Sequence, residues 1–171
     1  MKTLSSVCAY SMSWALAGMT SGWIAHKVPV SWIMRDTWIT RIRPFELRGR
    51  VYDRFFGVRR WKDRLPEAGG WLAGGWAKDR IRSFASEDLE RLAAETRRAE
   101  MVHLSNVMFG ATFLAWTEPT VGVIMVVFGA AVHLPFVVVQ RYNRARLQHV
   151  LSTPRRRLEL GRGSTTPADA R

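Results

Sequence analysis

Two long runs without a charged residue stand out in the C-terminal half of the sequence. The second run, residues 119–139, contains 21 uncharged residues, mostly Val, Met, Phe and Ala, and the first, residues 101–117, contains 17. About 20 apolar residues in a helix cross the hydrocarbon core of a membrane, and core helices of soluble proteins are seldom apolar on every face for so long. The polar break at Glu118-Pro119 between the runs predicts a transmembrane helical hairpin.

A third uncharged run, residues 4–25, lies near the N-terminus and contains five serines. It has two interpretations. Lys2, the short apolar stretch and Ala15-Leu16-Ala17 resemble a signal peptide with a small-residue cleavage site. Alternatively, Gly18-x-x-x-Gly22 is typical of a close-packed face on an uncleaved span.

The distribution of basic residues favours the uncleaved span. Residues 27–100 contain 17 Lys and Arg, and another 8 follow residue 139. Basic segments beside membrane spans remain on the cytoplasmic side. If both segments are cytoplasmic, the hairpin turn lies outside and the first run crosses the membrane from outside to inside. A cleaved signal would instead export all 17 basic residues.

Between residues 32 and 61, aromatic or aliphatic residues alternate with arginines at roughly helical spacing. This pattern is typical of an amphipathic helix in the plane of the lipid headgroups, and Pro44 is expected to divide it. The glycine-rich segment 65–75 lacks the Gly-Lys-Ser/Thr ending of a phosphate-binding loop and is interpreted as a flexible turn. The acidic start at 86–88 predicts the N-terminus of the helix that leads into the hairpin.

These patterns predict an all-α integral membrane protein of the cell membrane, with a multi-pass topology and cytoplasmic basic segments and C-terminus. It has an N-terminal span or signal-like helix, interfacial amphipathic helices and a C-terminal transmembrane helical hairpin. The segments are 1–26, the apolar N-terminal run; 27–86, the basic and aromatic region with its glycine-rich loop; 87–147, the helix and hairpin; and 148–171, a basic tail predicted to be disordered.

Composition supports this class. The net charge of +12, from 26 Lys and Arg against 14 Asp and Glu, predicts an anionic partner, either nucleic acid or a membrane surface. Eight tryptophans favour the membrane, because Trp collects at its interfaces. The single cysteine, Cys8, excludes a disulfide framework and a thiolate zinc site. The oligomeric state is left open.

Familiar catalytic and metal-binding motifs are missing from the sequence. It has no Gly-x-Ser-x-Gly nucleophile elbow, and no histidine is followed by an acid five residues later. Glu-x-x-His occurs once, at Glu100 and His103, whereas a di-iron bundle needs two copies. We therefore predict neither a metal nor a resident cofactor.

Two polar clusters remain as candidate chemistry. At about 100° per residue, Glu95, Glu100 and His103 share one face of a helix, and Arg98 lies on its flank. The second cluster follows the last apolar run, at residues 141–143, and consists of Arg141, Tyr142 and Asn143.

The hairpin connects the clusters, because residues equally far from its turn lie at equal depth. With the turn between residues 118 and 119, His103 pairs with His133, and residues 95–98 reach the level of residues 141–143. Simpler interpretations stay open: the arginine runs are anchors on the cytoplasmic side, and Glu100 with Arg97 is a helix-surface ion pair. A structural role is as plausible for His103 as a catalytic one. His133 is more unusual, because polar groups inside a bilayer are costly.

Three blocks of the sequence resemble the glycosyl-4,4'-diaponeurosporenoate acyltransferases of staphyloxanthin-type carotenoid synthesis. The blocks are RRWKDRLPEAG at 59–69, ETRRAEMVH at 95–103 and LPFVVVQRYNRARL at 134–147. The resemblance covers about residues 25–147, with blocks in similar order and spacing. It departs at Ala145, where proline is expected, and after Val150.

The resemblance implies a membrane enzyme that esterifies the sugar of a glycosylated carotenoid, or a related glycolipid, with a fatty acyl chain. The acyl donor, acyl-CoA or acyl carrier protein, is a co-substrate. We expect His103 to act as general base on a sugar hydroxyl, oriented by Glu100 or Glu95. Substrate contacts are expected from arginines and polar groups near the hairpin and from the first block: Arg98, Arg141, Tyr142, Asn143, His133, Trp61 and Lys62.

Two other functions fit parts of the pattern. A non-catalytic scaffold of a lipid or carotenoid pathway explains the charge and the aromatic residues, but gives no reason for His133. Nucleic-acid binding explains the basic stretches alone, without a recognisable binding module. We therefore expect a membrane, an acceptor and a donor as partners, and no nucleic acid.

Overall fold

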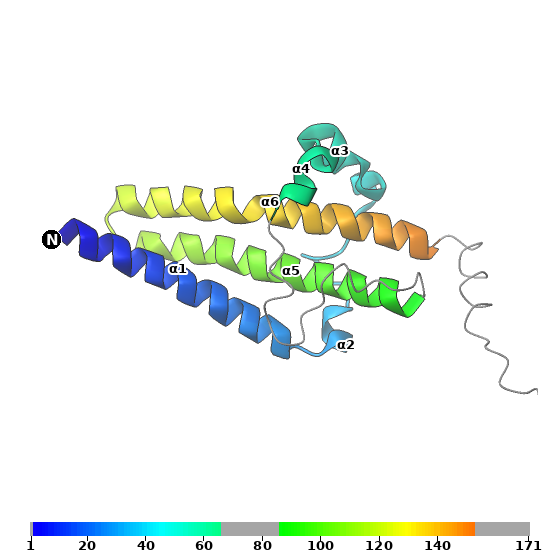
Figure 1. Cartoon of the computed structure of the whole chain (residues 1–171), viewed down its shortest axis with the longest axis horizontal. Coiled ribbons are helices and arrows are strands. Elements are labelled where there is room, and N and C mark those ends of the chain that lie inside the picture. Colours follow the sequence, from blue (N-terminus) through cyan, green and yellow to red (C-terminus); the bar gives the residue numbers. More distant parts are fainter. Residues whose placement is uncertain (1, 66–85, 153–171) are drawn as a thin grey trace, which may run out of the picture. The chain divides into compact units, whose positions relative to one another are not determined.

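The computed structural model describes residues 2–65 and 86–152, and within these ranges every regular element is a helix (Figure 1). The glycine-rich segment after Leu65 and the tail from residue 153 lie outside the described residues, so the predictions made for them stay predictions. The elements are α1 (Lys2–Lys27), α2 (Val30–Ile33), η1 (Pro44–Gly49), α3 (Arg50–Phe56), α4 (Val58–Trp61), η2 (Lys62–Arg64), α5 (Ser86–Thr112), η4 (Phe113–Ala115) and α6 (Pro119–Ser152).

The chain divides into two compact units. The first contains residues 1–35 and 98–137, and the second contains residues 36–97 and 138–171, as far as these are described. Helices α5 and α6 therefore each contribute one part to each unit.

In the first unit, α1 and the adjoining parts of α5 and α6 run side by side (Figure 1). The hairpin turn lies where the sequence predicts it: α5 ends at Thr112, a short 3-10 turn follows, and α6 begins at Pro119. Proline suits the first position of a helix because its φ angle is already helical and the missing N–H has no partner there anyway.

Helix α1 packs on the hairpin through Trp14. A Cβ atom added at Gly129 of α6 would lie 2.7 Å from the Trp14 ring, and one added at Gly110 of α5 would lie 3.3 Å from it. The indole therefore fills a notch that only glycine leaves open on both hairpin helices. Further along, Asn106 donates a hydrogen bond of 2.8 Å to the hydroxyl of Ser21 on α1.

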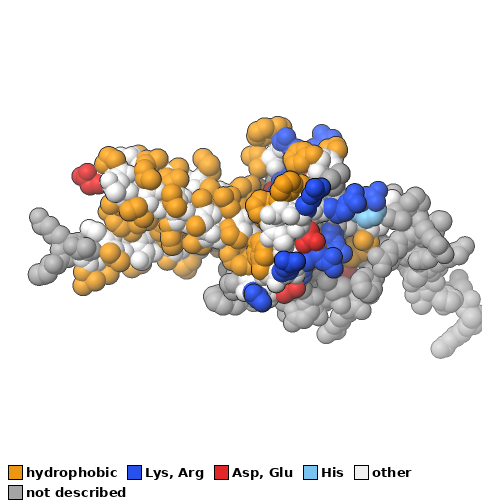
Figure 2. All heavy atoms as spheres, turned by 90° about the horizontal axis from the view of Figure 1, so that it is seen from above, with side chains coloured by type: hydrophobic (Ala, Val, Ile, Leu, Met, Phe, Trp, Pro, Cys, Tyr) orange, Lys and Arg blue, Asp and Glu red, His pale blue; other side chains and the backbone are white. Residues whose placement is uncertain are grey.

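The helices of the first unit carry large hydrophobic side chains on their outer surface. Helix α6 is the one helix in the described part of the chain that is long and apolar enough to cross a membrane. Only 17% of its most apolar stretch is buried inside the protein. Figure 2 shows hydrophobic side chains covering this unit on the face in view, while Lys and Arg gather over the second. Exposed residues include Leu4, Val7, Met12, Leu16, Met19, Met108, Leu114, Val123, Ile124, Val127 and Phe128.

In the second unit, the chain from Pro44 to Arg64 forms short helical turns around a small core. Tyr52 and Val58 pack with Val139 and Tyr142 of α6. The turn before α3 needs glycine, because Gly49 has a φ of +86° and a Cβ there would lie 3.2 Å from Tyr142.

The predicted amphipathic helix before Pro44 is wrong, since residues 36–43 are not helical. The reason is visible in the hydrogen bonds. Backbone carbonyls of Ile39, Thr40 and Arg41 accept hydrogen bonds from arginine side chains of α6 and not from amides within a helix. These guanidinium groups bind a segment that is irregular and contains a turn at residues 38–40, where the amide of Arg41 donates to the carbonyl of Thr37 at 2.9 Å.

Candidate active site

His103 and His133 form the contact that their equal distance from the hairpin turn predicts. Their Nδ1 atoms lie 3.0 Å apart, which joins α5 to α6 within the first unit. The predicted pairing is confirmed. Because each Nδ1 lies within hydrogen-bond distance of the other, one ring donates its Nδ1–H and the other accepts with its Nδ1 lone pair.

Two aromatic rings hold the histidine rings in place. Phe136 stacks on His103, with ring centres 4.5 Å apart and an angle of 11° between the planes. Trp14 stacks on His133 at 5.8 Å and 28°. Sequence reasoning missed both residues. For Phe136 a signal existed, because it follows His133 by three residues and so shares its side of the helix.

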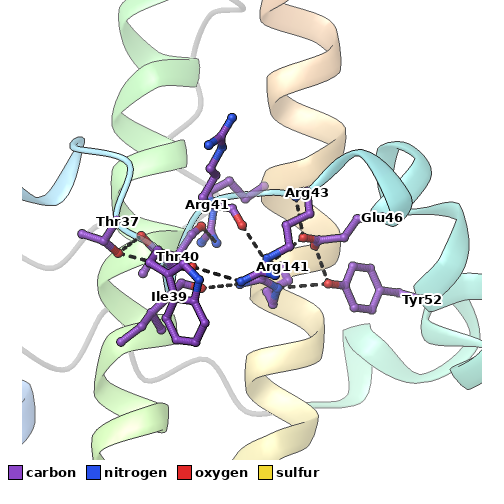
Figure 3. Close-up of polar contacts among 10 residues, drawn as sticks. Thr37, Ile39, Thr40, Arg41, Arg43, Glu46, Tyr52 and Arg141 are labelled. Carbon is purple, nitrogen blue, oxygen red and sulfur yellow. Dashed lines mark hydrogen bonds and ion pairs between the residues drawn. The ribbon is translucent and has the colours of Figure 1, made fainter.

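The Arg141 guanidinium is the centre of a second polar cluster, in the second unit (Figure 3). It donates to the Glu46 carboxylate at 2.6 Å and, through Nε, to the Tyr52 hydroxyl at 3.0 Å. It also donates to the carbonyls of Ile39 and Arg41, each at 3.0 Å. These bonds engage Arg141 in holding residues 39–52 against α6.

Glu46 is completely buried, at 0% exposure, and its charge is stabilised by three donors. Besides Arg141, the Tyr52 hydroxyl donates to one of its oxygens and the backbone N–H of Arg43 donates at 2.7 Å. Burial alone raises the pKa of the Glu46 carboxyl, but the hydrogen bonds from Arg141, Tyr52 and Arg43 outweigh burial and lower this pKa below its usual value. Burial and the neighbouring carboxylate raise the pKa of Tyr52 to about 12.

Sequence reasoning missed Glu46 and Tyr52. A signal was present, because Glu46 is the one acidic residue between Thr37 and Tyr52, in a segment rich in arginine. A lone acid among arginines is a natural partner for one of them, although the sequence does not say which.

The remaining predicted residues of the hairpin helices differ in burial. Glu100 is completely buried, whereas Glu95 and Arg98 are half-buried. Arg98 lies within 3.5 Å of the carbonyl of Val28. Tyr142 is buried in the core of the second unit, where its hydroxyl accepts a hydrogen bond of 2.7 Å from Arg146, and Asn143 beside it is half-buried.

In the second unit, Trp61 is the last residue of α4 and Lys62 is the first residue of η2. The indole N–H of Trp61 donates to the carbonyl of Phe56 at 2.8 Å, and Lys62 pairs with Asp63 at 2.5 Å. Trp61 also lines an open hollow of about 640 Å³, whose wall includes three arginines, Arg54, Arg59 and Arg60.

Comparison with known proteins identifies the family of the chain. A family model described as glycosyl-4,4'-diaponeurosporenoate acyltransferase matches residues 35–153. The chain belongs to this family. The resemblance seen in the sequence is therefore confirmed, and the protein is an enzyme of the acyltransferase class.

Relatives of the same name match most of the chain. The glycosyl-4,4'-diaponeurosporenoate acyltransferase of Staphylococcus haemolyticus (strain JCSC1435) is 29% identical over 140 residues, which cover 82% of this chain and 81% of that protein. The protein of that name from Staphylococcus aureus (strain bovine RF122 / ET3-1) is 25% identical over 149 residues, which cover 87% of this chain and 90% of that protein. No solved structure matches.

Proposed function

We propose that this acyltransferase transfers a fatty acyl group to a sugar hydroxyl of a glycosylated carotenoid, at the cell membrane. The observation that carries the proposal is the match of residues 35–153 to the family of glycosyl-4,4'-diaponeurosporenoate acyltransferases. A glycosyl group offers hydroxyls as acceptors, and the carotenoid part is apolar enough to lie in a bilayer.

The membrane location is supported by the surface of the first unit. Soluble monomers rarely expose large contiguous apolar patches, whereas lipid-facing helices do. With 26 residues, α1 is about 39 Å long, enough to cross a hydrocarbon core of ~30 Å. We propose three spans, formed by α1 and the two arms of the hairpin, with the turn at Glu118 outside and the basic segments in the cytoplasm.

The proposed reaction centre is the histidine pair. His103 takes the proton of a sugar hydroxyl on its Nε2 atom while that oxygen attacks the carbonyl carbon of the acyl donor. The bond between the acyl carbon and its leaving group breaks, and the leaving group receives the proton from His103. An acyl thioester, as in acyl-CoA or acyl carrier protein, supplies this activated carbonyl. Glu100 or Glu95 orienting His103 stays a prediction.

Other polar residues are proposed to bind the substrates. Arg98 and Asn143 are candidates for the acyl donor headgroup or the oxyanion. The hollow lined by Trp61, three arginines and Asp53 is proposed to receive a polar, anionic part of a substrate, or the sugar, and Lys62 follows Trp61 in the sequence. Arg141 was also expected to bind the acyl donor headgroup or the oxyanion. Its hydrogen bonds with Glu46, Tyr52 and two carbonyls favour instead a role in stabilising the fold.

The test is lipid mass spectrometry in a host that makes a glycosylated carotenoid but no acylated product. Expression of this chain should convert the precursor into its acyl ester. His103→Ala should lower the rate by about 10²–10⁴-fold, because a general base contributes about that much. His26→Ala, in the same unit, is the matched control and should leave the rate unchanged.

Each outcome decides a different point. Retained activity in His103→Ala would refute the general base but leave the reaction class standing. An unchanged lipid profile with the expressed wild-type chain would refute the acyltransfer to this acceptor, and a membrane scaffold would then be the better account.

A further inference from the structure

We infer that His133 and Trp14 are positioning residues for the acyl transfer, and that α1 therefore belongs to the working enzyme. This inference rests on the proposed role of His103 as general base. Neither residue needs to touch a substrate. Their contribution is to fix which nitrogen of His103 accepts the proton and where that nitrogen points.

The contact between the two Nδ1 atoms, at 3.0 Å, requires that one ring carries hydrogen on Nδ1 and the other does not. For His103 to accept a proton on Nε2, its own Nδ1 must carry hydrogen, and this N–H then donates to the Nδ1 lone pair of His133. His133 in turn carries its hydrogen on Nε2. When His103 takes up the proton of the sugar hydroxyl, the positive charge that forms is stabilised by the same hydrogen bond. In a Ser-His-Asp triad, an aspartate has the same role: it orients the base histidine and stabilises its protonated form.

A hydrogen bond to one atom still allows a ring to rotate, so the stacking contacts matter. Phe136 lies flat against His103, with planes 11° apart, and Trp14 lies over His133, with planes 28° apart. A ring that is stacked on one face and hydrogen-bonded at its edge has a defined plane and a defined direction for its remaining nitrogen. The four rings come from α1, α5 and α6.

Trp14 is itself held by the shape of the hairpin. Its ring occupies the notch above Gly129 and Gly110, and also contacts Phe109, Phe113 and Phe128 with ring centres 5.3 to 5.9 Å apart. A Cβ at Gly129 would come within 2.7 Å of the indole, so any larger residue there must displace it. This provides a way to move Trp14 without mutating it.

The first experiment compares two replacements of His133 by steady-state kinetics of the purified full-length protein in lipid nanodiscs. His133→Phe keeps a flat ring for Trp14 but removes the acceptor, and should lower kcat about 100-fold with KM changed less than about threefold. His133→Asn places an amide oxygen near the former Nδ1 and should recover at least a tenth of the wild-type kcat. Equal rates for His133→Phe and the wild type would overturn the inference, as would equal losses in both variants.

The second experiment tests Trp14 through its notch. Gly129→Ala should lower kcat about tenfold by displacing the indole, and Trp14→Phe combined with Gly129→Ala should recover part of it because the smaller ring fits. Gly18→Ala is the matched control, since a Cβ at Gly18 meets no atom within 4 Å. A fully active Gly129→Ala variant would refute the role of Trp14. Circular dichroism and gel filtration confirm that each variant is folded.

A third measurement separates this inference from the proposed function. Nitrogen-15 NMR of histidine-labelled protein distinguishes the two neutral tautomers, and single-histidine replacements assign the signals of the four histidines. We expect hydrogen on Nδ1 of His103 and on Nε2 of His133, whether or not the acceptor is a carotenoid glycoside. The opposite assignment would refute the positioning role, whereas failure of the wild-type enzyme to form an ester would refute the function alone.

Discussion

Glu46 and Arg141 are 95 residues apart in the sequence, and their side chains form an ion pair of 2.6 Å in which the carboxylate is completely buried. The pair joins the turns that follow Pro44 to the C-terminal part of α6. Tyr52 completes it by donating to Glu46 and accepting from Arg141. The second unit is therefore organised around a buried polar cluster as much as around its small apolar core.

Removing the Glu46 carboxylate should be strongly destabilising. Glu46→Ala removes the buried carboxylate that neutralises Arg141, whose side chain is 15% exposed, and breaking such a pair costs about 3–5 kcal/mol. The free energy of unfolding can be measured by denaturant titration of the protein in detergent micelles. Asp63→Ala is the control, because Asp63 is 73% exposed in its pair with Lys62 and should change this energy by less than about 1 kcal/mol. Similar effects of the two substitutions would contradict the importance of the buried pair.

The same pair predicts a dependence of stability on acid. The folded-state pKa of Glu46 is lower than the ordinary value of 4.5 that it regains on unfolding. Its contribution is therefore complete above about pH 4.5 and is lost as the pH falls through the folded-state pKa. Thermal unfolding of the wild type between pH 7 and pH 3 should show this loss. The loss should be smaller in Glu46→Gln, which has no charge to titrate; an identical profile would show that other carboxyl groups govern the acid transition.

The features that the sequence predicted correctly depend only on helix length and on distance along the chain. Helix length and the position of Glu118-Pro119 define the hairpin, and equal distance from its turn then brings His103 to His133. The network around Arg141 follows no such rule. It depends on an irregular segment, residues 36–43, whose carbonyls bind arginine side chains, whereas the alternation of aromatic and basic residues there predicted a helix. Trp14 was missed because the notch that receives its ring is formed at Gly110 and Gly129, which have no side chains to mark the contact in the sequence.

A charge on the outer face of α6 distinguishes a membrane span from an exposed helix in water. Val127 is 61% exposed, so Val127→Arg should be almost neutral if water surrounds the helix. In the middle of a bilayer the arginine costs about 2.5–3.5 kcal/mol. We expect poor insertion and a lower yield in the membrane fraction after alkaline carbonate washing, with Val127→Ala as the neutral control. Normal yield of the arginine variant would argue against this span.

The packing of Trp14 and Ser21 on the hairpin predicts that α1 is retained after synthesis. Cleavage after Ala17 would remove Trp14 from its notch above Gly129 and expose that cavity to lipid or water. Removal of a well-packed Trp typically costs 3–5 kcal/mol, so cleavage would destabilise the unit that holds the histidine pair. Peptide mapping by mass spectrometry, on protein purified from membranes through a C-terminal tag, should recover the peptide that contains Trp14. Protein that begins at Gly18 and still forms ester would show that the enzyme works without this helix.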